Sequence, residues 1–237
     1  MLPGAVSAAM ARIMRESCGK GPARSRTYVC DRFVFSVLGD VLTPVEHALK
    51  EGGREEFVRR LRLTFEAVMT ARLTAEVERL TDRRVVGHRS ELVFDPDFAI
   101  EIFVLEKPVA ESPPARREGR LRAAIANAMA RTMHEHWGTG PTRAKAYLED
   151  NFLFCVLEDP LTAVERTLMN GGQHDLVRRL RLEFQELKGP VLTAAVEQLT
   201  GRTVLTCQSE VVFDPDMVIQ VFVLAAPAPE RVSMLAA

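Results

Sequence analysis

The sequence of this chain repeats itself once, and this repeat constrains the fold more than any other feature. A constant offset of 119 residues aligns the first half with the second without a gap, and about half of the aligned positions are identical. For example, Val58–Leu63 recurs as Val177–Leu182. A match held in one register over so long a stretch indicates homologous structural units in tandem. We therefore predict two domains of the same fold, at residues 1–108 and 121–227.

The segments outside the repeat predict a linker and a tail. Residues 109–120 are rich in proline and polar side chains, which is typical of a semi-rigid linker. Residues 228–237 have no counterpart in the first copy and predict a loose tail. Because tandem copies usually reuse a self-complementary surface, we expect a pseudo-two-fold pair within the chain, and further self-association stays open.

Composition excludes several classes of protein. Of 237 residues, 47% are hydrophobic and 27% charged, which is an ordinary globular mixture. The net charge of −1 gives no basic field that would attract nucleic acid. No apolar run approaches the length of a membrane-spanning helix. The four cysteines (Cys18, Cys30, Cys155 and Cys207) lack zinc or disulfide spacing. We expect a reduced cytoplasmic protein without metal or cofactor, peripheral to a membrane only through a partner.

Each copy reads as an α-β-α-α-β-β unit of the α+β class, with a helix layer on a mainly antiparallel sheet. In the first copy we predict helices at about 5–17, 43–52 and 55–80, and strands at about 33–38, 84–94 and 98–105. On the long helix, Val58, Leu61, Phe65 and Val68 recur at the spacing of a core-facing stripe. In the second copy, the first helix is expected at about 121–136, and Gly189-Pro190 predicts a kink or a break in the long one.

Three sets of polar residues favour structural roles over chemistry. Thr43 with Glu46, and Thr162 with Glu165, have the spacing of a helix capping box rather than of a catalytic hydroxyl and base. Asp95 with Asp97, and Asp214 with Asp216, flank a proline between two strands and favour a turn over a cation site. His134 and His136 diverge on a helix, which favours a surface position over a metal pair.

Two further features are candidates for binding a small anion. Gly-x-Gly-Pro loops follow the first helix of each copy, with an arginine close by, although turn geometry alone also explains them. Six arginines occur on two equivalent helices and could bind a carboxylate, phosphate or bicarbonate, or form a solvated face. Glu91 and Glu210 could be exposed or pair with these arginines. The candidate anion-binding residues are Gly19, Gly21, Arg24, Arg59, Arg62, Gly138, Gly140, Arg143, Arg178 and Arg181.

A leucine among the arginines suggests an interface. Leu63 lies off the predicted apolar stripe, and Leu182 repeats the anomaly in the second copy. A single exposed leucine is ordinary, but the same one in both copies indicates a contact between the copies or with a partner. No Ser/His/Asp set occurs in both copies, since His47 becomes Arg166 and His88 becomes Cys207. No catalytic residue is predicted.

The order of motifs resembles the bacterial MpsC family, also called YbcI-like. Gly-x-Gly-Pro is followed by Leu-Thr-x-x-Glu, by Val-Arg-Arg-Leu-Arg-Leu and by the Asp-Pro-Asp hairpin in both copies. Members are mostly single-domain, so two copies suggest a fused dimer. Thr139 replaces the lysine of the first copy's Gly-Lys-Gly-Pro, which is a departure from the pattern.

The resemblance implies a place in a sodium-translocating, membrane-potential-generating system whose other components are linked to inorganic carbon uptake. It supplies no catalytic residues. We therefore expect a non-catalytic accessory or regulatory protein with a protein of the membrane system as its partner. A small-anion or nucleotide-binding module is the alternative, and an enzyme ranks third.

Overall fold

The computed structural model describes residues 1–109 and 116–227 and divides the chain into two compact units, Met1–Pro113 and Pro114–Ala237. We call them unit 1 and unit 2. Unit 1 comprises α1 (Leu2–Cys18), β1 (Arg24–Cys30), β2 (Phe33–Gly39), α2 (Pro44–Glu51), α3 (Glu55–Thr81), β3 (Val85–Val93) and β4 (Phe98–Leu105). Unit 2 comprises α4 (Arg116–Trp137), β5 (Arg143–Glu149), β6 (Phe152–Glu158), α5 (Ala163–Asn170), α6 (His174–Thr200), β7 (Val204–Val212) and β8 (Met217–Leu224).

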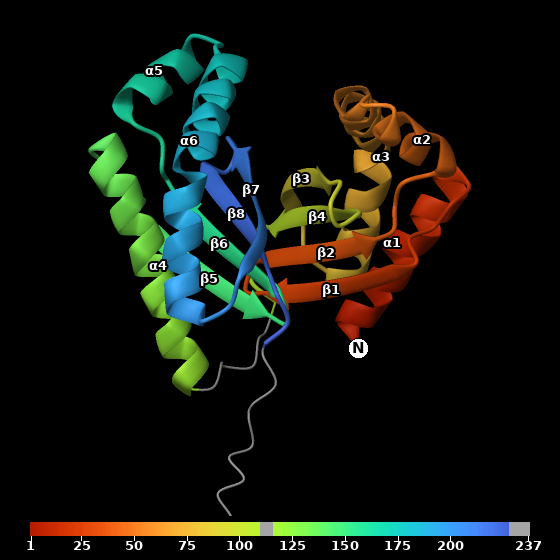
Figure 1. Cartoon of the computed structure of the whole chain (residues 1–237), viewed down its shortest axis with the longest axis horizontal. Coiled ribbons are helices and arrows are strands. Elements are labelled where there is room, and N and C mark those ends of the chain that lie inside the picture. Colours follow the sequence, from red (N-terminus) through yellow and green to blue (C-terminus); the bar gives the residue numbers. More distant parts are fainter. Residues whose placement is uncertain (110–115, 228–237) are drawn as a thin grey trace, which may run out of the picture. The chain divides into compact units, whose positions relative to one another are not determined.

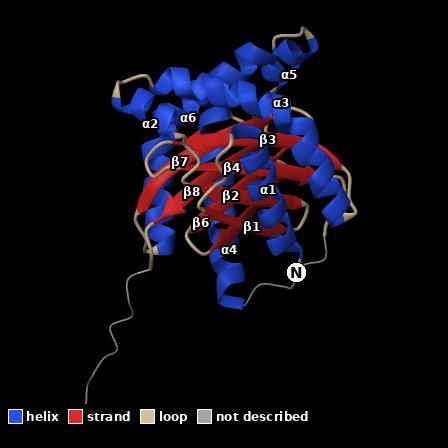
Figure 2. Cartoon of the chain, turned by 90° about the vertical axis from the view of Figure 1, so that its right-hand side faces the viewer, coloured by secondary structure: helices blue, strands red, loops and turns tan. Residues whose placement is uncertain are grey.

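Each unit is one four-stranded antiparallel sheet with helices packed on a face of it (Figure 1, Figure 2). The strand order is β1-β2-β4-β3 in unit 1 and β5-β6-β8-β7 in unit 2. The helix-facing side chains of β2 and β4, such as Leu38 and Phe103, join Met10 of α1 and Leu73 of α3 in one core. The predicted α+β class and the duplication are confirmed. The near-two-fold pairing of the copies stays a prediction.

The structure adds one strand per unit to the predicted order, which becomes α-β-β-α-α-β-β. Strands β1 and β5 pair with β2 and β6 at the sheet edge. Their alternation was overlooked because charged residues such as Arg24 and Arg26 share β1 with the buried Tyr28 and Cys30. Helix α4 also begins at Arg116, inside the predicted linker. The linker residues 110–115 and the tail 228–237 lie outside the described residues.

The predicted core stripe of the long helix is wrong in two of its four positions. Val58 is buried and the half-buried Phe65 packs against the core, whereas Leu61 and Val68 are exposed. The buried side chains of α3 are Val58, Arg62, Glu66, Met69, Leu73, Val77 and Thr81. Arg62 and Glu66 were expected to face solvent because they are charged, and the predicted core face was therefore placed too far from them.

Helix α6 continues through Pro190, so the predicted break does not occur. Pro190 is exposed, while Leu192 and Val196 are buried in the core of unit 2. The backbone hydrogen bond that proline removes therefore lies on the solvent side, where water can satisfy the freed carbonyl.

The predicted turns and caps are present. Thr43 and Thr162 each form a capping box with the glutamate three residues later. Asp95-Pro96-Asp97 joins β3 to β4, and the Asp97 carboxylate accepts hydrogen bonds from the backbone N–H groups of Val41 and Leu42. Within residues 1–109 and 116–227, no helix has both the length and the apolar composition to cross a bilayer.

Candidate functional site

A buried glutamate–arginine pair connects the short and the long helix of each unit. Arg62 Nε and Nη2 donate to the two carboxylate oxygens of Glu46, both at 2.6 Å, and Nη2 also donates to the Val41 carbonyl oxygen at 2.6 Å. In unit 2, Arg181 makes the same bidentate contact with Glu165, at 2.5 and 2.6 Å, and donates to the Pro160 carbonyl oxygen. The same glutamates close the capping boxes, so one carboxylate fixes both helices.

The pair is almost fully excluded from solvent, since Arg62 is 3% exposed and Arg181 only 1%. Burial would raise the pKa of Glu46, but hydrogen bonds from Arg62 and Thr43 outweigh it and lower that pKa below its usual value. The same balance lowers the pKa of Glu165. These two arginines therefore lie inside their units rather than on an open arginine face, and a glutamate of the same unit accepts hydrogen bonds from Nε and Nη2 of each.

The neighbouring arginines face a different part of each unit. Arg59 Nη1 donates to Glu91 Oε1 at 3.2 Å and to the Leu92 carbonyl oxygen, and its guanidinium lies 5.1 Å from the ring centre of Phe94. In unit 2, Arg178 donates to the Val211 carbonyl oxygen, lies 3.8 Å from Glu210 and stacks on Phe213. Glu91 and Glu210 therefore pair with the first arginine of each run. Their role in binding an anion stays a prediction.

The Gly-x-Gly-Pro loops have a turn function in the structure. Gly19 and Gly138 end α1 and α4 in the left-handed conformation, with φ of 74° and 71°, which glycine adopts without strain. Lys20 Nζ donates to the Leu42 carbonyl oxygen, a contact that Thr139 cannot make. Gly21 and Gly140 follow in the same loops. Arg24 and Arg143 begin β1 and β5 and pair with Asp40 and Glu158 on the surface.

A row of polar side chains crosses the helix-facing side of the sheet in unit 1. Thr27, Ser36, Glu101 and Ser90 are successive cross-strand neighbours on β1, β2, β4 and β3. Ser7 Oγ donates to Thr27 Oγ1, which lies 2.9 Å from Ser36 Oγ. Ser90 Oγ donates to Glu101 Oε1 at 3.0 Å, and His88 Nε2 lies 2.7 Å from Glu101 Oε2. We call these six residues, together with Glu66 of α3, the polar belt.

Glu66 brings a second carboxyl group to the polar belt. It is 7% exposed, and Glu101 is 1% exposed. Burial and the neighbouring Glu101 carboxylate raise the pKa of Glu66 to about 8, whereas Ser90 and Arg62 act in the opposite direction. At neutral pH, Glu66 therefore holds a proton inside the fold, because two ionised carboxylates in one dry site repel each other.

Unit 2 has lost the charges of this belt. The equivalents of Ser7, Thr27, Ser36, Glu66, His88, Ser90 and Glu101 are Ala126, Ala146, Cys155, Gln185, Cys207, Ser209 and Gln220. The two acids have become two amides, and Gln220 Nε2 donates to Gln185 Oε1 at 3.0 Å. Burial raises the pKa of Cys207 to about 12 and that of Cys155 further, so both stay neutral thiols.

The polar belt was not predicted, although a charged residue within an apolar strand pointed to it. Glu101 is the lone charged residue in the apolar strand Phe98–Leu105. A charge at such a position requires a buried partner.

The remaining candidates do not converge on a metal site. His136 Nδ1 lies 2.7 Å from the Thr132 carbonyl oxygen on the exposed side of α4. None of the four cysteines forms a disulfide. Over the described ranges, no three His, Cys, Asp or Glu side chains are grouped so that they could hold a metal ion.

Large apolar side chains are exposed at the same positions of both units. The exposed residues of unit 1 are Val45, Phe57, Leu61, Leu63 and Val68, and their equivalents in unit 2 are Val164, Leu176, Leu180, Leu182 and Leu187. Their exposed fractions lie between 38% and 79%. We call each set the hairpin patch, because all five positions lie on α2 and the first half of α3, or on α5 and α6.

A comparison with protein families finds one family that matches both units. The family model described as "Na+-translocating membrane potential-generating system (MpsC)" matches residues 1–107 and, a second time, residues 117–226. The chain belongs to the MpsC family. The two matches coincide with units 1 and 2, so the chain holds two MpsC units in tandem. No match was found among the curated proteins or among the solved structures.

Proposed function

We propose that this MpsC chain is a non-catalytic accessory protein of a membrane-potential-generating system linked to inorganic carbon uptake, and that it docks a protein of that system through its hairpin patches. The observation that carries the proposal is the exposure of large apolar side chains at five equivalent positions in both units. Scattered exposed leucines need no explanation. Two units that differ at about half of their positions, yet expose the same five, indicate a shared binding surface.

The hairpin patch has the geometry of a helix-binding surface. Phe57, Leu61 and Val68 are spaced by four and seven residues, so they lie on one face of α3. That face lies about 100° around the helix from the buried stripe of Val58, Met69 and Leu73. Helix α3 thus has two apolar faces, one for its own core and one for a partner.

The charge around the patch indicates what the partner presents. Arg60 and Arg179 are exposed beside Leu61 and Leu180 in the two units. An amphipathic helix with an apolar stripe and acidic flanks would bury the leucines and pair with these arginines. We therefore assign an acidic amphipathic helix of the membrane-system protein as the partner.

Site-specific photocrosslinking in the native host tests this assignment. A photoreactive phenylalanine analogue replaces Leu61 in one variant and Leu180 in another. Matched control variants carry it at Ala8 of α1 or Asn127 of α4, which are exposed, equivalent positions on other helices. We expect both patch positions to crosslink the same membrane-system protein, within an acidic helix, and the control positions to crosslink it far less.

A charge insertion gives the independent check. Leu61→Asp with Leu180→Asp should abolish that crosslink from a neighbouring patch position, while Ala8→Asp with Asn127→Asp should leave it intact. Equal crosslinking from patch and control positions, or an unchanged crosslink in the Leu→Asp variant, would show that the exposed leucines do not bind a partner.

A further inference from the structure

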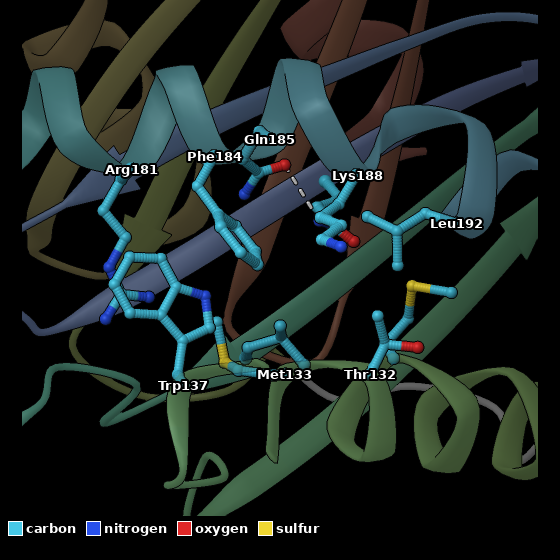
Figure 3. A pocket seen from close by; sticks show the side chains of 11 residues that line it. Thr132, Met133, Trp137, Arg181, Phe184, Gln185, Lys188 and Leu192 are labelled. Atoms are coloured by element: carbon cyan, nitrogen blue, oxygen red, sulfur yellow. Dashed lines mark hydrogen bonds between the residues drawn. The ribbon is translucent and has the colours of Figure 1, made fainter. Parts of the chain in front are cut away.

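Unit 2 contains a pocket between α4, α6 and the helix-facing side of its sheet (Figure 3). Its lining includes Met133, Trp137, Arg181, Phe184, Lys188 and Gln220. The space amounts to about 380 Å³ when the solvent at its mouth is included. The enclosed part has room for little more than one water molecule. A ligand could therefore insert a small polar group and leave the rest of itself at the mouth.

Buried polar atoms around this pocket lack hydrogen-bond partners. Arg181 Nη1, Gln220 Oε1 and Ser209 Oγ are all enclosed, and none has a partner among the described residues. Ser209 and Gln220 are cross-strand neighbours on β7 and β8, and Gln220 and Arg181 line the pocket itself. Unsatisfied buried groups are rare in folded proteins and mark places where a water, an ion or a ligand is bound.

Unit 1 shows what occupies the corresponding place there. Glu66, the equivalent of Gln185, extends from α3 beneath the helix, and its carboxyl group interacts electrostatically with Arg62. Ser90, the equivalent of Ser209, donates to the Glu101 carboxylate. Unit 1 therefore supplies carboxyl groups of its own to the arginine and the serine whose counterparts in unit 2 have unsatisfied atoms.

Three other replacements change the lining of this place in unit 2. Where unit 1 has Ile13, Cys18 and Met69, unit 2 has Thr132, Trp137 and Lys188. The indole of Trp137 lies against the Arg181 guanidinium, 4.5 Å from its central carbon, and against the ring of Phe184. Lys188 adds a half-exposed positive charge to the lining. The change from acids to amides together with the added lysine makes the pocket attractive to an anion.

We propose that the unit 2 pocket binds a small monocarboxylate, whose carboxylate lies beside the Gln185 amide, the counterpart of the Glu66 carboxyl group in unit 1. One oxygen accepts from Arg181 Nη1, and Lys188 balances the added charge at the mouth. The aliphatic part of the ligand packs against Trp137, Phe184 and Met133. A phosphate or sulfate fits this site poorly, because Glu165 and the Pro160 carbonyl oxygen already hold Nε and Nη2 of Arg181 and the enclosed space is small.

The site carries its own reporter, since Trp137 is the one tryptophan of the chain. Sodium acetate and sodium propionate are titrated into the full chain at constant ionic strength, with sodium chloride making up the balance. We expect a saturable change in Trp137 emission for both carboxylates, with propionate binding more tightly because of its extra methylene group. The chloride series alone should give no saturable change.

Variants drawn from the unit 1 sequence test the assignment of residues. Lys188→Met installs the Met69 side chain and should weaken binding roughly fivefold, the effect of a half-exposed ion pair. Gln185→Glu places a carboxyl group of the chain beside the bound carboxylate, which should repel it and remove the response. Exchanging the reporter by Trp137→Cys with Cys18→Trp places the indole in unit 1, where carboxylates should give no response.

Several outcomes would overturn the proposal. An absent response to both carboxylates in the parent chain would show that the pocket holds solvent only. An equal response to chloride would show that it takes any small anion. Unchanged affinity in both Lys188→Met and Gln185→Glu would place the carboxylate elsewhere. None of these outcomes bears on the hairpin patches, because no residue of the patch lines the pocket.

Discussion

Units 1 and 2 share their buried ion pair and differ in the polar belt beside it. Glu46–Arg62 and Glu165–Arg181 have the same bidentate geometry, and both glutamates also cap a helix. Glu66 follows Arg62, and Gln185 follows Arg181, one turn later on the same helix, yet unit 1 holds an acid at this position and unit 2 holds an amide.

This difference separates what the fold requires from what one unit has added or lost. The buried glutamate–arginine pair has the same geometry in both units, and we infer that the fold needs it to connect α2 to α3 and α5 to α6. The polar belt is dispensable for folding, since unit 2 forms the same sheet and the same helices with Ala146, Cys155 and Gln220 in its place. The belt and the pocket are therefore where the two units have acquired different properties.

The largest effect is expected from breaking the shared pair. Arg62→Met leaves Glu46 buried without its guanidinium and should lower the free energy of unfolding of unit 1 by about 3–5 kcal/mol. Arg181→Met should cost unit 2 a similar amount. Hydrogen exchange followed by mass spectrometry on the full chain resolves α3 from α6 and measures each loss separately.

The pH dependence of the pair has a defined sign. The folded pKa of Glu46 is lowered, so the stabilisation is present above its unfolded pKa and is lost as pH falls through the folded value. Arg62→Met should therefore remove part of the acid sensitivity of unit 1. A loss below 1 kcal/mol in either unit would contradict a shared structural role for the pair.

An effect with the opposite pH dependence is expected at Glu66. Its folded pKa of about 8 lies above the usual value of 4.5, so folded unit 1 retains a proton that the unfolded chain has released. The stabilisation is complete below about pH 4.5 and is lost as pH rises towards 8. Glu66→Gln should flatten this decline and stabilise unit 1 at pH 8, because each pH unit over which only the folded chain keeps the proton costs about 1.4 kcal/mol.

Unit 2 supplies the matched control, because Gln185 is the natural counterpart of that variant. Protection of α6 should change little between pH 6 and pH 8.5, while protection of α3 should fall after correction for intrinsic exchange. Parallel pH profiles for the two helices would show that the polar belt does not titrate in this range.

Sequence reasoning reached the parts of the fold that depend on local pattern. The repeat, the capping boxes at Thr43 and Thr162 and the Asp-Pro-Asp turns follow from neighbouring residues, and the structure contains them. Strand β1 was missed because edge position and charged neighbours obscured its alternation.

The buried polar groups could not be predicted without knowledge of the tertiary contacts. Arg62 lies in the core because it pairs with Glu46 of α2, and Glu66 lies there beside Ser90 of β3 and Glu101 of β4. All of these partners come from other elements. When only apolar residues are counted, the pattern therefore predicts that Leu61 and Val68 face the core, although both are exposed. The register that aligns Thr27, Ser36, Glu101 and Ser90 is likewise a property of the sheet and not of any one strand.

The smallest effect is expected at the outer arginines, and it sharpens the comparison in another way. Arg59→Gln and Arg178→Gln each remove a half-exposed cation and should cost less than about 1 kcal/mol. The loss should be larger in unit 1, because Arg59 Nη1 lies 3.2 Å from Glu91 while Arg178 Nη1 lies 3.8 Å from Glu210. High salt should remove most of this difference, since screening weakens the ion pairs but not the hydrogen bonds to the Leu92 and Val211 carbonyl oxygens. If Arg59→Gln and Arg178→Gln cost the same at low salt, the carbonyl contacts and the stacking on Phe94 and Phe213 hold these side chains, and the outer arginines belong with the features that both units share.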